Sequence, residues 1–252
     1  MKILHIVAGV WPGSGIAEVV AGLCRALKAQ GHEVAVATTE EGEGEVLKFE
    51  PASLKATPRQ GSSKGGEKLE TGNLKLGETL WSDADHKFLN IEHRTGEEQV
   101  RVVMFRRSCP RAVYFSWGMV WGLGKEVREA DTVHVHGCWT FPVWWGAWLA
   151  LRYKKVLVMS PHGSLDPVRL GHSGWKKYLV GWMDRWLLRR ADVVHATCEA
   201  ERAWIQAVLK FESSKVLKLG RGPRIVVIPN GVGREMLEFA TSRISYYDHL
   251  DQ

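Results

Sequence analysis

Short apolar runs alternate with amphipathic stretches along most of the chain, and this alternation predicts the fold. Apolar runs of roughly four to eight residues are typical of buried strands, and apolar residues at helical spacing are typical of helices. The chain opens on a predicted strand, Ile3–Ala8, passes through a predicted helix, Ile16–Gln30, and returns to a strand, Val34–Ala37. Gly31 stands where that helix ends, which is a common place for glycine. These elements form a strand, helix, strand unit.

The same alternation resumes after residue 99. Strands are expected at the apolar runs "VRVVMF", "DTVHVHG", "KVLVMSPHG", "DVVHATC" and "RIVVIPNGV", with helices over residues 113–130, 139–153, 175–190 and 199–210 between them. Strands that alternate with helices predict an α/β fold, a Rossmann-like parallel sheet with helices on both faces. Right-handed crossovers then bring the carboxyl ends of all strands to one edge of the sheet, where ligands bind in such folds.

Residues 40–99 break the pattern, because they are polar and rich in Gly, Ser, Lys and Glu. A segment of this composition predicts a long insertion with at most one short element of its own. The functional alternative is a lid over a bound acceptor.

Composition narrows the classes of partner. The 252 residues carry a formal net charge of +6, which favours acidic partners such as phosphorylated ligands, anionic lipid or nucleic acid. No apolar run reaches the roughly 18 residues of a membrane span. The four cysteines form no CxxC pair and no signal peptide is recognisable, so we expect reduced thiols in a cytoplasmic protein.

A glycine loop, "GVWPGSGIAE", joins the first strand to the first helix. Gly13 and Gly15 lie directly before the helix, with Ser14 between them. Backbone N–H groups at the start of a helix attract anions, and glycine allows close approach, so the loop suits a phosphate. A plain strand-to-helix turn is the alternative. The dinucleotide fingerprint fails, because Glu18 occupies the place of its third glycine.

Histidines mark the ends of two predicted strands. His134, His136 and Cys138 alternate in "VHVHGC", a spacing compatible with a metal site, with packing at a strand end or with contact to a ligand. We favour no metal, because no compact second pair of ligands follows. His162, in "SPHG", could donate a hydrogen bond to a hydroxyl or phosphate group. Asp166 is expected to cap a turn.

Aromatic and basic residues gather in the second half of the chain. Most of the twelve tryptophans lie between Trp117 and Trp186, and basic residues far outnumber acidic ones from Arg152 to Arg190. This combination suits an anionic bilayer surface. The alternative, which we prefer for at least half of these tryptophans, is packing against the sheet.

Five motifs in this order resemble glycosyltransferase family 4, and more narrowly its amino-terminal, acceptor-side domain. They are "WPGSGIAEVVAGLCRALKAQGHEVAVATT", "DTVHVHGCWTFP", "SPHGSLDP", "ADVVHATCEAE" and "VIPNGV". The resemblance implies the GT-B arrangement, in which two Rossmann-like domains face each other across a cleft. It places Gly13 and Gly15 near the donor phosphates and the acceptor, although family members commonly have Gly-Gly where Ser14 intervenes. It makes His162 the catalytic histidine facing the sugar donor. His136 lines the cleft, and Glu199 and Glu201 lie at its rim.

The resemblance also implies a division of the chain. We expect one domain over residues 1–233, with the polar insertion at about 40–99. Residues 234–252 would be a short tail in place of the donor-binding domain. In the family that second half carries the Arg/Lys pair and the two glutamates that bind the donor. The chain would then be the acceptor-side half of the enzyme, either truncated or dependent on a separate donor domain.

The function that this resemblance implies is a retaining, metal-independent hexosyl transfer. The donor would be a nucleotide sugar and the acceptor a cell-envelope or exopolysaccharide glycan, which includes lipid-linked glycans. We expect no cofactor and no nucleic-acid partner. The expected location is the cytoplasm, with peripheral contact to the inner face of the membrane. The alternatives are a non-catalytic protein that binds the acceptor or the membrane, and a nucleotide-dependent oxidoreductase or epimerase, which the failed fingerprint disfavours.

Overall fold

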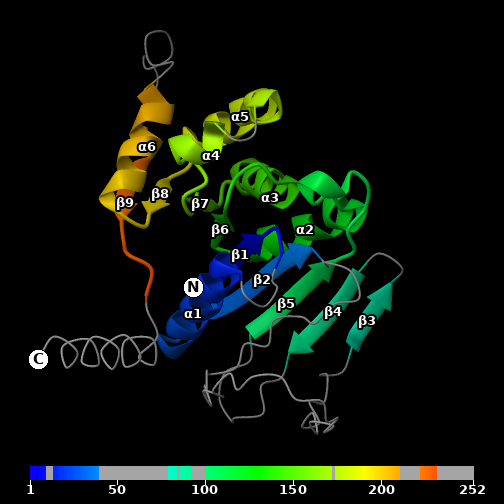
Figure 1. Ribbon diagram of the computed structural model, residues 1–252. Helices are drawn as coiled ribbons and strands as arrows, with labels where there is room; N and C mark the ends of the chain where they lie inside the picture. The colour runs from blue at the N-terminus through cyan, green and yellow to red at the C-terminus, as the bar shows by residue number, and fades with distance from the viewer. Residues whose placement is uncertain are drawn as a thin grey trace, which may run out of the picture.

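The computed structural model describes residues 1–9, 14–39, 79–83, 86–91, 100–171, 174–210 and 222–231 (Figure 1). A nine-stranded sheet runs through them in the order β3-β4-β5-β2-β1-β6-β7-β8-β9. The strands are β1 (Lys2–Val7), β2 (Glu33–Thr39), β3 (Thr79–Asp83), β4 (His86–Ile91), β5 (Val100–Phe105), β6 (Thr132–His136), β7 (Val156–Ser160), β8 (Val193–Ala196) and β9 (Arg224–Val227). The helices are α1 (Gly15–Ala29), α2 (Trp117–Glu129), α3 (Phe141–Arg152), α4 (Pro167–Gly171), α5 (Gly174–Leu188) and α6 (Glu199–Lys210), with a 3-10 turn, η1 (Arg111–Val113).

Every strand pairing from β5 across to β9 is parallel, as the sequence predicted. The chain starts inside the sheet at β1, moves through β2 to the edge strand β3, comes back through β4 to β5, and then crosses to β6 on the other side of β1. This reversal of direction lies between β1 and β6. In open α/β sheets the ligand crevice lies at such a reversal, beyond the carboxyl ends of the strands.

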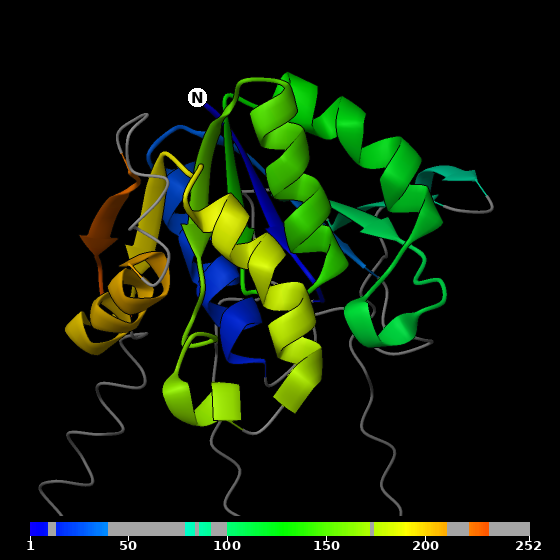
Figure 2. The same ribbon diagram turned by 90° about the horizontal axis from the view of Figure 1, so that it is seen from above.

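Helices cover both faces of the sheet (Figures 1 and 2). One apolar cluster joins α2, α3, α5 and α6 to one face, where Leu4, Ile6 and Val135 are fully or almost fully buried. A second cluster packs α1 through Val20 and Cys24 against the other face. The predicted fold class, a Rossmann-like sheet covered on both faces, is therefore confirmed.

A helix cap fixes the start of α1, and close packing positions α3 against β1. The Ser14 hydroxyl accepts a hydrogen bond from the Ala17 N–H at the start of α1, as expected of a capping serine. On α3, a Cβ at Gly146 would lie 2.4 Å from Cδ1 of Ile6, so a larger residue there would require the Ile6 side chain to shift. Ser14, which departs from the Gly-Gly of the family, thus has a structural role of its own.

Two helices begin later than the sequence predicted, because a residue in the left-handed region precedes each of them. Tyr114 has φ 60° and separates η1 from α2, and Trp139 has φ 59° and precedes α3. A side chain in this conformation interrupts a right-handed helix. The predicted helices from residue 113 and from residue 139 therefore start at Trp117 and Phe141.

The polar insertion contains more regular structure than the sequence suggested. Strands β3 and β4 pair antiparallel with each other, and β4 pairs antiparallel with β5 along its whole length. The expectation of at most one short element was therefore wrong. Apolar residues in "TLW" and "FLNI" are too few for a recognisable alternation, and pairing with β5 supplies the order that the local sequence lacks.

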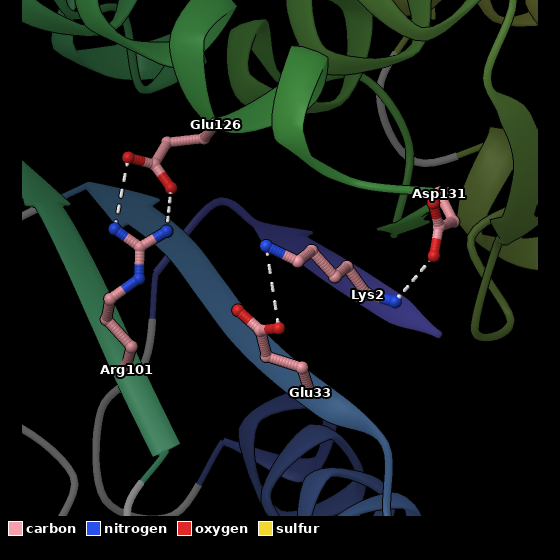
Figure 3. A network of polar contacts seen from close by, with 5 residues as sticks. All are labelled: Lys2, Glu33, Arg101, Glu126 and Asp131. Carbon is pink, nitrogen blue, oxygen red and sulfur yellow. Dashed lines mark hydrogen bonds and ion pairs between the residues drawn. The ribbon is translucent and has the colours of Figure 1, made fainter.

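Charged residues hold the amino edge of the sheet together, on the side away from the crevice (Figure 3). Two guanidinium nitrogens of Arg101 bind the two carboxylate oxygens of the buried Glu126, which links β5 to α2. Lys2 joins β1 to two neighbours, because its ammonium lies 3.6 Å from the Glu33 carboxylate and its backbone N–H donates to Asp131 at 2.8 Å.

Among the described residues, no helix combines the length and the apolar character needed to cross a bilayer.

Candidate functional site

Four neighbouring strands place polar side chains on one face of the sheet, the face that also carries α1. The parallel register sets His5 beside His134 and Val7 beside His136. It also sets His136 beside Ser160, and β8 continues the row with His195. Alternation along each strand explains this gathering, because residues two apart point to the same side. A polar layer therefore lies beneath the carboxyl edge of the sheet.

One hydrogen-bonded chain of imidazoles runs from this edge into the interior. His136 Nδ1 lies 2.9 Å from His162 Nε2, and His136 Nε2 lies 2.9 Å from His5 Nδ1. His162 is half-buried at the edge, whereas His136 and His5 are buried. Nε2 of His5 is buried and has no hydrogen-bond partner among the described residues. This chain connects the outermost histidine with an unpaired nitrogen in the core.

A second chain runs sideways across the sheet and has a fixed direction. His195 Nε2 lies 2.7 Å from the Ile228 carbonyl, which can only accept, so this nitrogen donates. In the neutral ring Nδ1 of His195 then accepts from the Ser160 hydroxyl at 2.8 Å. The Ser160 oxygen in turn accepts from His134 Nε2 at 2.7 Å. The backbone carbonyl beyond β9 thereby orients a row of side chains on β8, β7 and β6.

Burial keeps four histidines of this layer, His5, His134, His136 and His162, neutral near pH 7. It lowers the pKa of His5 to about 4. It also lowers the pKa of His162 to about 4, with the Glu201 carboxylate opposing and His195 adding to the decrease. Burial, together with the neighbouring histidines, holds the pKa values of His134 and His136 well below the ordinary range. Each imidazole therefore offers one donor and one acceptor.

Ring nitrogens of His5, His134 and His136 lie within 4.8 Å of one another, close enough to consider a metal. Their orientation favours hydrogen bonding, because both nitrogens of His136 already point at other imidazoles. Metal ligands must direct their lone pairs to one common point. Cys138, the third candidate of the sequence motif, lies beyond the turn at Gly137, packs into the cluster on the opposite face and has a thiol pKa raised by burial. The donor set does not fit a metal as it stands.

The backbone at His162 is held in an unusual conformation by Glu201. His162 and Gly163 both have positive φ, 51° and 71°, and the first is uncommon for a residue with a side chain. Oε1 of Glu201 accepts from the Gly163 N–H at 2.6 Å. Oε2 accepts from the N–H and the hydroxyl of Thr197, each at 2.7 Å. One buried carboxylate therefore ties the turn after β7 to the loop before α6.

The start of α1 lies next to this edge. A Cβ at Gly137, which follows β6, would lie 4.0 Å from Cδ1 of Ile16 in the first turn of α1. The Gly137 N–H donates to the Ser160 carbonyl at 2.8 Å. Apart from its chain neighbours and the backbone of α1 itself, no atom of the described residues lies within 4 Å of a Cβ built on Gly15. The start of α1 thus lies close to the end of β6, which is hydrogen-bonded to the end of β7.

The sequence-predicted site residues fall into three groups. His136 and His162 are directly bonded, and Ser14 and Gly15 belong to the helix start beside them. Glu199 lies at the same edge on the first turn of α6 but is exposed and paired with Arg202 at 3.4 Å. Gly13 lies outside the described residues. Roles in binding or catalysis remain predictions for all of them.

Sequence reasoning missed His5, Ser160 and His195. The signal for His5 was present, because a polar residue interrupts the apolar run "ILHIV" on the face that His134 and His136 share. Ser160 and His195 also fall on that face by strand alternation. The hydrogen bonds that connect these side chains depend on the register between the strands, which no local sequence pattern indicates.

Residues 14–231 match the family model for the glycosyl transferase 4-like domain. The chain belongs to this family. The glycosyltransferase assignment made from the motifs is therefore confirmed at the level of the family. No curated protein matches the chain.

Solved structures similar to this glycosyl transferase 4-like domain include sucrose-phosphate synthase from Thermosynechococcus elongatus, with 14% identity and a TM-score of 0.48 over 94% of this chain and 50% of that one. The catalytic domain of starch synthase IV from Arabidopsis thaliana, bound to ADP and acarbose, has 14% identity and a TM-score of 0.45, with 92% and 52% covered. A transferase from Siraitia grosvenorii in complex with UDP has 11% identity and a TM-score of 0.44, with 100% and 56% covered. The chain spans about half the length of these proteins.

Proposed function

We propose that this domain forms the acceptor-side half of a glycosyltransferase that uses a nucleotide-sugar donor. The observation that carries the proposal is the convergence, at one edge of the sheet, of the α1 start and the His162 turn. A helix start favours the negative charge of phosphate groups. His162 offers a neutral imidazole nitrogen at the same edge, because Nε2 is engaged by His136 and Nδ1 has no hydrogen-bond partner among the described residues. Together they suit a sugar joined to a diphosphate.

The chemistry that we propose follows from charge. Transfer of the sugar leaves negative charge on the departing diphosphate, and dipoles fixed in advance toward that charge usually supply the largest catalytic contribution. On this side of the cleft the α1 start provides such a dipole, and His162 contacts the sugar. We propose a retaining hexosyl transfer without metal or cofactor. A second Rossmann-like half would grip the nucleotide, and the acceptor would be a glycan of the cell envelope or an exopolysaccharide.

Replacing His162 by alanine tests this proposal. In the protein that carries this domain, we expect His162→Ala to lower the rate of sugar transfer by a factor on the order of 10²–10³, the usual cost of losing one positioned group in a transition state. The assay follows radiolabelled nucleotide sugars and lipid-linked or free glycan acceptors. His32→Ala is the matched control, because His32 lies between α1 and β2 at the opposite edge.

The outcomes separate the proposed enzyme from its alternative. An unchanged rate in a folded His162→Ala variant would contradict the role of this histidine. Binding of acceptor without transfer of any tested sugar would favour a non-catalytic binding protein instead.

The sequence predicted the membrane contact over residues 152–190, and we propose that it also includes α2. Trp186 packs against the core and Arg190 stacks on its ring, whereas the side chains of Trp175 and Leu179 lie outside the described part of the chain. Among the tryptophans whose exposure the structure describes, Trp121 on α2 is the most exposed, at 80%. Other exposed tryptophans are Trp117 on α2, Trp148 on α3 and Trp182 on α5. Helices α2, α3 and α5 cover the same face of the sheet (Figure 2).

We propose that this helical face contacts an anionic bilayer. Exposed tryptophan suits the interface between lipid and water, and exposed basic residues, here Lys125 and Arg128 on α2, are attracted to anionic headgroups. Each basic residue near the surface contributes on the order of 1 kcal/mol at low ionic strength. The lipid surface would also present a lipid-linked acceptor to the neighbouring edge of the sheet.

Sedimentation with vesicles measures this contact. We expect the chain to sediment with vesicles containing phosphatidylserine at low salt and much less with neutral vesicles or at high salt. The double variant Trp117→Ala, Trp121→Ala should lose most of this binding. Ile228→Ala, which removes an exposed apolar side chain beyond β9, is the matched control and should bind normally. Equal sedimentation with neutral and anionic vesicles would argue against the proposal.

A further inference from the structure

The chain from His162 through His136 to His5 has two alternative directions. Each neutral imidazole carries one N–H and one lone pair, so each bond in the chain needs one donor and one acceptor. In the first direction His162 donates from Nε2 to His136, His136 donates to His5, and His5 carries its remaining hydrogen on the buried Nε2. In the second direction His5 donates from Nδ1 to His136, and His136 donates from Nδ1 to His162.

The two directions differ at both ends of the chain. The first buries an N–H of His5 that has no acceptor among the described residues, and it leaves His162 with a lone pair at Nδ1. The second buries a lone pair at Nε2 of His5, and it leaves His162 with an N–H at Nδ1. The protonation of the buried Nε2 of His5 is therefore coupled, through two hydrogen bonds, to whether Nδ1 of His162 is a donor or an acceptor at the edge of the sheet.

The buried end decides between the two directions. Among buried backbone groups, N–H donors without an acceptor are rarer than acceptors without a full set of donors. The same ranking applied to the ring nitrogen of His5 favours the second direction. Neutral rings are a condition of this reasoning, and burial supplies it, since it lowers the pKa of both His5 and His162 to about 4.

We propose that the His5–His136 pair positions the proton of His162 on Nδ1, so that the edge of the sheet presents a hydrogen-bond donor. The ligand atom that it selects is an acceptor oxygen, either of a sugar hydroxyl or of a phosphate. This identification of the ligand rests on the proposed function, whereas the position of the proton does not. His136 and His5 are positioning residues here, because they act on the ligand through His162.

The second chain of side chains provides an internal reference. The Ile228 carbonyl requires a proton on Nε2 of His195, the opposite tautomer from the one inferred for His162. The two histidines sit on neighbouring segments of the same face, with ring centroids 6.4 Å apart. One spectrum of one protein can therefore contain both tautomers, with the second known from geometry.

Nuclear magnetic resonance reads the tautomers directly. In the full chain labelled with ¹⁵N-histidine, long-range couplings between ring protons and ring nitrogens show which nitrogen is protonated, because the unprotonated nitrogen resonates well downfield. At pH 8 without ligand we expect His162 to be protonated on Nδ1 and His195 on Nε2. A protonated Nε2 on His162 would overturn the inference, whatever the protein transfers.

Two variants of His136 separate an effect on the proton of His162 from an effect on packing, because asparagine and aspartate are nearly equal in size. In His136→Asn the side-chain amide can still donate to Nε2 of His162, so we expect the proton of His162 to stay on Nδ1. In His136→Asp the carboxylate can only accept, so Nε2 of His162 should become protonated while His195 keeps its wild-type resonances. A His136→Asp variant with Nε2 of His162 still unprotonated would overturn the inference. The wild-type spectrum decides the case by itself if a variant does not fold.

Discussion

Lowering the pH from 7.5 to 5.5 is expected to reduce the free energy of unfolding by about 4 kcal/mol. The cause is the buried histidine layer of His5, His134, His136 and His162, whose pKa values burial holds below the ordinary histidine value of about 6.5, two of them at about 4. At pH 5.5 the unfolded chain binds a proton at each of these histidines and the folded chain does not. Acid therefore favours the unfolded state.

The magnitude follows from the size of the shifts. At pH 5.5, one unit below the pKa of an unfolded histidine, each such histidine lowers the free energy of unfolding by about 1.4 kcal/mol. Four of them lower it by about 5–6 kcal/mol. Asp184 acts in the opposite direction, because burial raises its carboxyl pKa to about 6 and the folded state gains a proton on acidification. Between pH 7.5 and 5.5 the protonation of Asp184 restores about 1 kcal/mol of the lost free energy of unfolding. Domains are stable by only about 5–15 kcal/mol in total, so the loss is large.

Urea unfolding at both pH values measures this loss. His5→Leu removes one titrating group and is expected to reduce the acid sensitivity by about 1.4 kcal/mol. A free energy of unfolding that stays constant between the two pH values would contradict the buried, neutral state of the layer.

Glu201→Ala is expected to destabilise the chain by about 3 kcal/mol or more, because it leaves three donors without their acceptor. The Glu201 side chain is buried and accepts from the Gly163 N–H and from two groups of Thr197. Leaving a buried donor unsatisfied costs about 1–3 kcal/mol, and the low end of this range applies to each of these donors because Gly163 and Thr197 are half-buried. The strained His162 turn should also lose its fixed position, and with it any contribution to ligand binding.

The neighbouring Glu199 is a matched control for this variant. Both glutamates lie in the first turn of α6 and both interact with its helix dipole, but the Glu199 side chain is 74% exposed and pairs only with Arg202 in the described residues. Exposed pairs of this kind contribute about 0–1 kcal/mol, so Glu199→Ala should change the free energy of unfolding little. Chemical denaturation of both variants measures the difference. Equal effects at the two positions would show that Glu201 acts only through its charge near the helix start.

Much of the fold could be predicted from the sequence because each parallel strand and each helix carries its own apolar pattern. The order of the motifs also indicated the family. The hairpin of β3 and β4 could not be predicted, since its residues lack a clear apolar alternation and its order comes from pairing with β5.

The site was predictable only in part. His136 and His162 were recognisable as histidines at strand ends, and the expectation that the carboxyl edge gathers such residues is met. The chain that links them to His5 depends on the register of β1 against β6, which is a property of the assembled sheet. The hydrogen bond from the Gly163 N–H to Glu201 likewise joins residues 38 positions apart, so no local sequence pattern could indicate it.

The hairpin inside the polar insertion has a consequence for the solubility of the domain. Without it, β5 would end the sheet with the nearly continuous apolar run "VRVVMF", and its free backbone N–H and C=O groups would be a template for strands of other molecules. With β4 paired along β5 and β3 beyond it, that template is occupied from within the chain. Trimming the insertion to obtain a smaller domain would therefore expose a surface prone to self-association.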